Sequence, residues 1–484
     1  MQFVSPEQAA AETGWDLVVV GSGFGSLFFL KRYLEKRPDD RVLVLERGHY
    51  NTEDWQFQNG VNSDILPEQT FRHAAGSEKP WDFTIGLGGS TNCWWALTPR
   101  MHPSDFKVRT ATGMGADWPI EYDDLVPYWQ EIERFMLIAG PDELDRFYPG
   151  TGPYAQPPHH LSTPDEIMIE KGDGYHFAMP AAKLSRAVEG RGRCCSSASC
   201  NLCPARAKFT ALNAMMETLA HPSVAIAIES KVTHLDVQNG ALRAVHFENG
   251  GRDYAASCDL CALGANAIHS PFIALRSGIA GHGVGRYLGE KMLVDAEIML
   301  DGVDHFDGGT DTTAFNLSII EAGRSSDFAN SVYLVKNSFK SGLRLDKGRW
   351  RQCLPVQMYV EDIFDYENGV SDDGGDEPVV RFKGFSDYAH AGLDHAMKRL
   401  PEVFSPLPIE DVRLTGILPT MGHVQGTMRM GNTIEDSVVD AGLIAHSVRN
   451  LCVVGTSVFP TTASANPTLS AAALSYRAVD LLLG

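Results

Sequence analysis

Short, uninterrupted apolar runs mark the first elements of the chain. Residues 16–20 and 41–45 have the length and the valine- and leucine-rich composition of strands buried on both faces, as in a parallel sheet. A glycine-rich turn at 21–26 and a helix-like segment at 27–36 separate the two runs. The pattern therefore predicts a strand, a tight turn, a helix and a second parallel strand.

Later segments carry related signals. An alternating run at 231–237, the pair Asn239-Gly240 and a run at 242–247 predict a β-hairpin. Apolar runs at 259–263 and 451–454, with a helix from about 467 to 483, predict a return to the first sheet. Strand-like runs lie between them at 332–335, 353–359 and 379–383, with a helix at 389–404.

These elements predict an α/β chain with two lobes. We expect a Rossmann-like nucleotide-binding domain in residues 1–290, to which residues 413–484 return. Residues 291–412 are expected to form an inserted α+β domain built on an antiparallel sheet. Parts of 120–190 are expected to contribute to the same side as the inserted domain.

The turn at 21–26 has the residues that a dinucleotide site needs. Gly21 allows a tight turn, Gly23 lets the backbone approach a pyrophosphate, and the following helix offers free N–H groups. Glu46 ends the second strand and can accept hydrogen bonds from ribose hydroxyls. Ser26 replaces the third glycine of the usual fingerprint, and Gly25 stands one place earlier. A glycine-rich turn without a ligand is the alternative.

Charge and cysteine content narrow the classes of function. The 484 residues include 41 basic and 61 acidic ones, a net charge of −20, so we expect no nucleic acid partner. We expect no transmembrane segment and no signal peptide. Nine cysteines cannot all pair, which indicates a reducing compartment. We therefore expect a cytoplasmic protein, periplasmic only if a partner carrying an export signal takes it there.

Ordered motifs along the chain carry a family resemblance. Besides the turn and Glu46, they are Gly-Leu-Gly-Gly-Ser-Thr-Asn at 86–92, Trp-Pro-Ile-Glu-Tyr at 118–122, Val-Gly-Arg-Tyr-Leu at 284–288, His-Val-Gln-Gly-Thr-Met-Arg-Met-Gly at 423–431 and Asn-Pro-Thr-Leu at 466–469. They resemble motifs of the glucose–methanol–choline (GMC) oxidoreductases, which bind FAD and oxidise alcohols. The resemblance implies FAD in the first domain and a substrate-binding inserted domain.

The resemblance also implies which residues hold FAD. They are Gly21, Gly23, Gly25, Ser26, Glu46, Arg47, Gly88, Gly89, Ser90, Asn92, Cys93, Val232, Gly264, Gly455, Pro467 and Thr468. Cys93 stands where some relatives have a histidine bonded covalently to the flavin. We expect a noncovalent flavin beside this thiol, with a cysteinyl link as the alternative. Lys291 stands where many relatives have a histidine, and we assign it no function.

Two residues of the C-terminal motifs are the expected catalytic pair. Alcohol oxidation removes the hydroxyl proton and moves a hydride from carbon to flavin N5. Histidine suits the proton transfer because its ordinary pKa lies near neutral pH. The resemblance places His423 as this base and Asn466 as the group that holds the substrate oxygen. A core histidine and a helix-capping asparagine are the alternatives.

Four cysteines crowd into one segment: Cys194, Cys195, Cys200 and Cys203. Thiolates with such spacing are typical of iron–sulfur ligation. The segment also resembles that of bacterial FAD-dependent sugar dehydrogenases of the same family, which hold a three-iron cluster, although their last spacing is one residue longer. We expect a 3Fe-4S cluster. A zinc site and a metal-free loop, with or without a disulfide, are the alternatives.

These expectations combine into one reaction. We expect an FAD-dependent dehydrogenase that oxidises a CH–OH group of a sugar or glycoside, a preference that comes from the resemblance alone. The electron acceptor would be a small subunit, a cytochrome or a quinone. An oxygen-using alcohol oxidase of the same fold, and a non-redox lyase or decarboxylase, are the alternatives.

Overall fold

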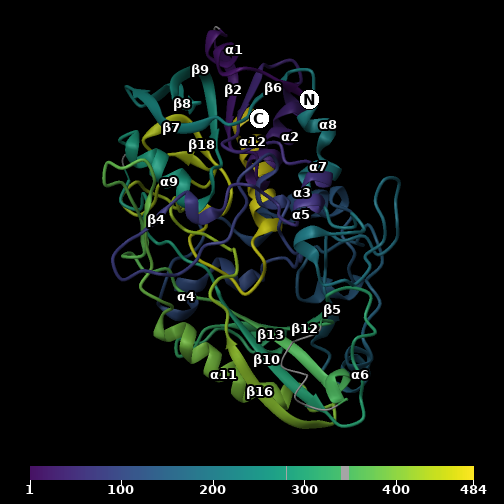
Figure 1. The fold of residues 1–484 in the computed structure, drawn as a ribbon. Coiled ribbons are helices and arrows are strands. Elements are labelled where there is room, and N and C mark those ends of the chain that lie inside the picture. The colour runs from purple at the N-terminus through teal and green to yellow at the C-terminus, as the bar shows by residue number, and fades with distance from the viewer. Residues whose placement is uncertain (13, 280, 339–347) are drawn as a thin grey trace.

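The chain folds into two lobes, each built on a large sheet (Figure 1). The computed structural model describes residues 1–12, 14–279, 281–338 and 348–484. Both termini lie in the upper lobe of the view, and the middle of the chain forms the lower one. The expected α/β fold with an antiparallel second sheet is confirmed.

The first lobe contains a nine-stranded sheet with a parallel centre. Its order is β1-β6-β3-β2-β9-β18-β17, and the β7–β8 hairpin attaches to β9. The bounds are Gln2–Phe3 for β1, Trp15–Val20 for β2, Val42–Leu45 for β3, Val224–Ala227 for β6, Lys231–Gln238 for β7, Ala241–Asn249 for β8, Arg252–Leu263 for β9, Ile444–Ala445 for β17 and Val448–Val453 for β18. Strands β2, β3, β6, β9 and β18 pair in parallel, and their apolar runs are continuous because helices and loops cover both faces.

Helices of the first lobe pack beside this sheet. Helix α2, Phe24–Lys36, starts three residues before the predicted segment because the extended Gly23 precedes its first turn. It packs against the C-terminal helix α12, Thr468–Leu483, and Arg32 of α2 bonds Asp480 of α12 through two 2.8 Å contacts. The other helices are α1 Pro6–Ala11, α3 Glu53–Asn59, α5 Val126–Phe135, α7 Ala211–Ala214, α8 Met216–Leu219 and α9 Asn266–Arg276. Helix α4, Val108–Thr112, lies lower in the view, toward the second lobe (Figure 1).

The second lobe contains a six-stranded antiparallel sheet, in the order β16-β10-β13-β12-β11-β5. The bounds are His176–Ala178 for β5, Met292–Leu300 for β10, Thr312–Asn316 for β11, Ser331–Lys336 for β12, Cys353–Val360 for β13 and Ile409–Ile417 for β16. Helix α11, Asp387–Val403, packs against it, and the short helices α6, Thr163–Lys171, and α10, Ser318–Glu321, lie nearby. The predicted domain boundary at residue 412 falls inside β16, because its pairing with β10 continues to Ile417.

A three-stranded sheet joins distant parts of the chain. Strand β15, Val379–Arg381, lies between β14, Gly369–Ser371, and β4, Arg72–His73. The strand-like run at 379–383 therefore pairs with an N-terminal segment and does not extend the six-stranded sheet. No described helix has both the length and the apolar character required to cross a bilayer.

Candidate functional site

The glycine-rich turn lies where the carboxyl ends of three parallel strands meet. Gly21 follows β2 with a φ of +81°, and a Cβ there would lie 2.9 Å from the carbonyl oxygen of Gly264, at the end of β9. A Cβ on Gly25 would lie 2.5 Å from the nitrogen of Gly455, just after β18. Helix α2 therefore starts against the backbone of neighbouring strand ends, which only glycine permits. Ligands of such sheets bind at this edge.

The same turn leaves one side open for a ligand. Nothing lies within 4 Å of the position that a Cβ on Gly23 would occupy. Gly23 also precedes α2 without a side-chain cap, so the first-turn N–H groups are not held by a capping side chain. The Ser26 hydroxyl donates to the carbonyl of Val20 at 3.3 Å and closes the inner side. We call the turn at 21–26 together with the first turn of α2 the cradle. It fits the pyrophosphate of a dinucleotide such as FAD.

The Glu46 side chain is hydrogen-bonded to the glycine-rich turn and to the residues that follow β3. Its carboxylate accepts hydrogen bonds from the Ser22 nitrogen at 3.1 Å, the Ser22 hydroxyl at 2.5 Å and the Gly48 nitrogen at 3.0 Å. The Glu46 carbonyl accepts from Ser230, two residues before Val232 on β7. The structure thus brings Glu46, at the end of β3, close to the start of β7, where Val232 lies. The Arg47 side chain forms an ion pair with Glu377 at 2.8 Å.

The loop at 86–93 packs directly on this turn. Gly88 and Gly89 have φ of +93° and +50°, and a Cβ on Gly89 would lie 2.9 Å from the Cα of Gly23. The Asn92 amide donates to the Leu87 carbonyl at 3.0 Å, and the Ser90 hydroxyl accepts from the Thr84 nitrogen at 3.2 Å. The loop is therefore held rigidly above the cradle, where the resemblance expects the flavin.

Cys93 ends this loop with a weakly bonded thiol. Its sulfur donates to the Ser90 carbonyl at 3.7 Å. Burial raises the pKa of the Cys93 thiol, and the nearby Asp82 raises it further. A thiol held neutral is a poor nucleophile, which favours a noncovalent flavin beside it.

His423 and Asn466 meet although 43 positions separate them. The His423 Nε2 and the Asn466 Nδ2 are 3.5 Å apart. Nδ1 of His423 and Oδ1 of Asn466 are buried and have no hydrogen-bond partner among the described residues. The two side chains therefore contact each other, and each keeps a further polar atom to which a ligand hydroxyl could bond.

Backbone contacts position both residues. The Glu290 carboxylate accepts from the His423 and Met421 nitrogens at 3.2 Å, and Lys79 pairs with the same carboxylate. Asn466 is held from the other side, since Lys291 donates to the carbonyl of Ala465.

The helix after Asn466 begins without a side-chain cap. Pro467 precedes α12, and Thr468 is its first residue. The first-turn N–H groups of α12 and the positive end of its dipole are therefore available to an anionic group.

Burial keeps the His423 imidazole neutral. Desolvation lowers its pKa well below the ordinary value, and the charge of the neighbouring Lys291 lowers it further. A neutral imidazole can accept a proton, so this environment suits a base.

A small cavity of about 10 Å³ lies against Asn466. Its walls include Tyr148, Phe315, Val332, Leu334 and Tyr359 beside Asn466. Most of the lining is apolar or aromatic, and the amide of Asn466 lies at one end. This is the usual composition of a small-molecule site, in which a few polar groups set the orientation. Phe315 and Tyr359 line the cavity, whereas Tyr333 packs in the core and bonds the Ala396 carbonyl.

The four clustered cysteines do not form a metal site in the described structure. All are free thiols, and the described residues contain no group of three or more His, Cys, Asp or Glu side chains that could hold a metal ion. Cys200 is buried, donates to Asp311 at 3.2 Å and accepts from Lys183 at 3.5 Å. Cys194 instead contacts Thr310. This arrangement does not support the expected iron–sulfur cluster or the zinc alternative.

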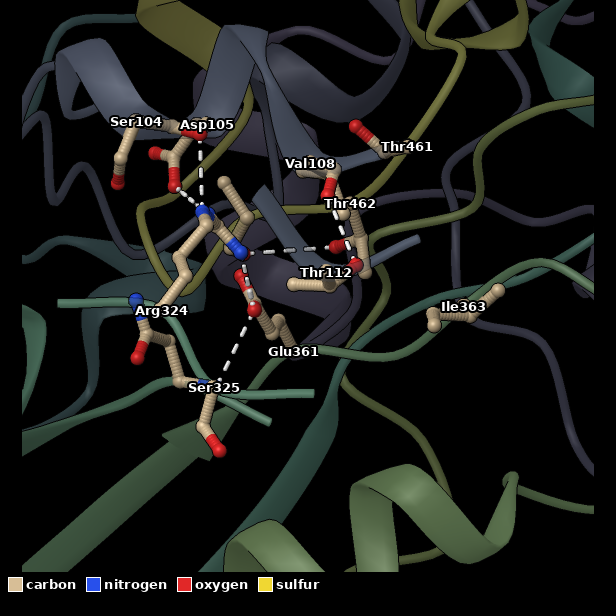
Figure 2. A network of polar contacts seen from close by, with 12 residues as sticks. Ser104, Asp105, Val108, Thr112, Arg324, Ser325, Glu361, Ile363, Thr461 and Thr462 are labelled. Carbon is tan, nitrogen blue, oxygen red and sulfur yellow. Dashed lines mark hydrogen bonds and ion pairs between the residues drawn. The ribbon is translucent and has the colours of Figure 1, made fainter. Parts of the chain in front are cut away.

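Sequence reasoning missed a buried charge network around Arg324 (Figure 2). Arg324 bonds Asp105 and Glu361, the latter at 2.5 Å, and all three side chains are at most 3% exposed. Arg324 also donates to the Ser104 carbonyl at 2.9 Å. Glu290 and Lys291 were missed as well. The only signal in the sequence was the lysine at a position where relatives have histidine.

Comparison with known proteins agrees with this geometry. Residues 380–475 match the family described as GMC oxidoreductase. The fructose dehydrogenase large subunit of Gluconobacter japonicus is 24% identical, over 82% of this chain and 80% of its own. The 6'''-hydroxyparomomycin C oxidase of Streptomyces lividus is 25% identical, over 97% of this chain and 92% of its own.

A solved structure shares the fold across nearly the whole chain. Pyridoxine 4-oxidase from Mesorbium loti superposes with a TM-score of 0.67 at 19% identity, over 97% of this chain and 99% of its own. The family match, the relatives and the dinucleotide cradle agree: the C-terminal part of the chain matches the GMC oxidoreductase family, and the chain is an FAD-dependent oxidoreductase that acts on CH–OH groups.

Proposed function

We propose that the protein is a dehydrogenase that oxidises a CH–OH group of a sugar or glycoside, with His423 as the base. The observation that carries the proposal is the contact between His423 and Asn466, whose Nε2 and Nδ2 are 3.5 Å apart. Each side chain keeps a second buried polar atom without a partner among the described residues, and Asn466 lines a cavity. A substrate hydroxyl placed between them would have both a proton acceptor and an amide that orients it.

The chain's own residues perform the proton chemistry. Asn466 orients the hydroxyl, and the neutral His423 takes its proton, which makes hydride loss from the carbon easier. Bound FAD would supply the hydride acceptor. The uncapped first turn of α12 offers N–H groups to negative charge near the site. The apolar cavity wall excludes water, which strengthens these interactions.

The aromatic residues of the cavity lining and the names of the relatives support a sugar as the substrate class. Phe315 and Tyr359 offer aromatic faces against which the C–H face of a sugar ring can pack, and Asn466 can bond a hydroxyl at the ring's edge. Relatives named for fructose and for an aminoglycoside support the same class. A small alcohol with an apolar body would fit the same walls, so the substrate panel must include both classes.

The electron acceptor is the least constrained part of the proposal. The relative named as a large subunit supports a small-subunit partner, and a cytochrome or a quinone would serve the same role. The 3Fe-4S cluster stays a prediction from the spacing, and iron above zinc in metal analysis, with broad visible absorption, would support it. The cytoplasmic location also stays a prediction.

One experiment tests the reaction and separates its alternatives. The purified, FAD-loaded protein is mixed without oxygen with sugars, glycosides and simple alcohols, and flavin absorbance is followed. Bleaching supports alcohol oxidation, and its absence with every alcohol would favour the lyase or decarboxylase alternative. Dye reduction without peroxide in air supports a dehydrogenase. Stoichiometric peroxide would identify an oxidase instead.

A further inference from the structure

Lys291 is the most unusual charged residue near the catalytic pair. It is fully buried, and its ammonium group donates to a backbone carbonyl, that of Ala465. Among the described residues it makes no direct ion pair, whereas the neighbouring Lys79 and Arg324 both contact carboxylates. A buried cation without a contacting carboxylate is costly, so a purely structural donor would be better served by a neutral group.

Carboxylates surround Lys291 without contacting it. Asp105, Glu290 and Glu361 all act on its charge, from three different segments of the chain. Arg324 neutralises Asp105 and Glu361 (Figure 2). Lys79 neutralises Glu290. The network thus holds three cations and three carboxylates, and Lys291 is the cation that faces the catalytic pair.

Two contacts connect Lys291 to the reaction. Its bond to the Ala465 carbonyl holds the residue before Asn466, and both Ala465 and Asn466 line the cavity. Its charge also acts on His423, whose backbone nitrogen bonds Glu290, the residue before Lys291. One side chain therefore touches the backbone of one member of the pair and influences the charge of the other.

We propose that Lys291 is a positioning residue for alcohol oxidation: its ammonium group holds the Ala465–Asn466 backbone, and its charge keeps His423 in the neutral, proton-accepting form. The inference rests on the proposed function. The same cation favours negative charge on the substrate oxygen as its proton leaves, which offsets its weakening of the base.

Burial also makes this charge responsive to pH. Desolvation lowers the pKa of Lys291 to about 7, although Asp105, Glu290 and Glu361 oppose that shift. His423 is therefore kept neutral most strongly below pH 7, where Lys291 is charged. Above that pH the charge is lost, but His423 is then neutral without help. Lys291 thus extends the working range of the base toward acid, and the two groups titrate as a coupled pair.

Two substitutions separate the hydrogen bond from the charge. Lys291→Met removes both, whereas Lys291→Gln keeps a donor near the Ala465 carbonyl and removes the charge. We expect the acid limb of the kcat/KM profile to move to higher pH by about one unit or more in both variants, because a neighbouring like charge has been removed. We expect kcat to fall in Lys291→Met and to recover in part in Lys291→Gln.

Lys36→Met is the matched control, since Lys36 of α2 forms a partly exposed ion pair with Asp480 of α12. It should leave both the profile and kcat unchanged. An acid limb that stays in place in folded, flavin-loaded Lys291→Met and Lys291→Gln proteins would overturn the proposal.

A measurement on the wild-type holoenzyme covers the case in which neither variant folds. The His423 ring is followed by NMR during a pH titration, and its signals are assigned by their loss in His423→Gln. We expect a step near pH 7 that reports Lys291, besides the step of His423 itself. A single titration step in the His423 signals would overturn the proposal that the charge of Lys291 acts on His423. This titration needs no turnover, so it stays informative even if no alcohol bleaches the flavin and the proposed function fails.

Discussion

Individual polar atoms decide the chemistry of this protein. His423 and Asn466 each have a buried ring or amide atom without a partner among the described residues, which is rare for buried polar groups. A ligand hydroxyl could satisfy these atoms, and Asn466 also lines the nearby cavity.

Loss of the imidazole should remove the base and leave the cofactor site intact. We expect His423→Ala to lower kcat by about 10²–10⁴-fold, the usual contribution of a general base. Flavin content should stay at the wild-type level, because the pyrophosphate cradle lies on other segments. Steady-state dye reduction and flavin absorbance measure the two quantities.

The matched control for this variant is His282→Ala. His282 is exposed and stacks on Tyr366 with ring centroids 4.9 Å apart. It should retain wild-type turnover and flavin content. Equal turnover in both variants would remove His423 from the mechanism.

At the scale of elements, the start of α2 depends on close backbone contact. Gly25 lies in the first turn of α2 and contacts Gly455. Gly23 is the residue directly before α2 and has open space beside it. The two glycines therefore have different tasks, because one permits packing and the other permits a ligand to approach.

Two alanine substitutions should separate these tasks. Alanine normally favours a helix over glycine, yet Gly25→Ala places a Cβ 2.5 Å from the Gly455 nitrogen. We expect it to destabilise the flavin-free protein by about 1–3 kcal/mol, the usual cost of overpacking. Thermal unfolding of the flavin-stripped protein measures this.

Gly23→Ala is the matched substitution two residues away. Its new methyl group meets nothing within 4 Å, so the flavin-free protein should unfold like the wild type. The methyl group would instead occupy the space where a pyrophosphate approaches. We expect a marked loss of bound flavin per chain, and wild-type flavin affinity in Gly23→Ala would contradict the placement of the cradle.

At the scale of the whole molecule, the two lobes are joined by a buried ion network. Arg324 follows α10 on the side of the six-stranded sheet, Asp105 belongs to the segment before α4, and Glu361 follows β13 (Figure 2). Burial raises the pKa of both carboxyl groups, and Arg324 opposes that shift. The guanidinium therefore holds two buried carboxylates that would otherwise be unpaired.

Removal of this guanidinium should destabilise the protein strongly. We expect Arg324→Leu to lower the free energy of unfolding by about 3–5 kcal/mol, because buried charges lose their partner. The loss should be larger at pH 8 than at pH 5. Carboxyl groups with a raised folded pKa bind more protons in the folded state, so stability falls as pH rises through that window. Urea midpoints at both pH values measure the effect.

Arg399→Leu is the control for this comparison. Arg399 forms a more exposed pair with Glu402 at 2.8 Å, and such pairs contribute about 0–1 kcal/mol. A loss in Arg324→Leu no larger than in Arg399→Leu would show that the network does not stabilise the fold.

Local patterns were enough to predict most of the first lobe. The apolar runs of β2 and β3 and the glycine turn are read from adjacent residues. The β7–β8 hairpin was equally clear, because Asn239 and Gly240 both adopt positive φ as an Asn-Gly turn requires. The pairing of β15 with β4 was not predictable, since β4 lies about 300 positions away along the chain and consists of two residues.

The sequence alone determined the strands, the cradle and the family motifs, because these depend on short-range periodicity and on glycines at fixed spacing. Only the tertiary structure decided what lies beside the catalytic pair. It brought Lys291 into contact with the residue before Asn466, and it brought Glu290 into contact with the backbone of His423. Burial and electrostatic coupling arise between segments far apart in the chain, so no local pattern encodes them.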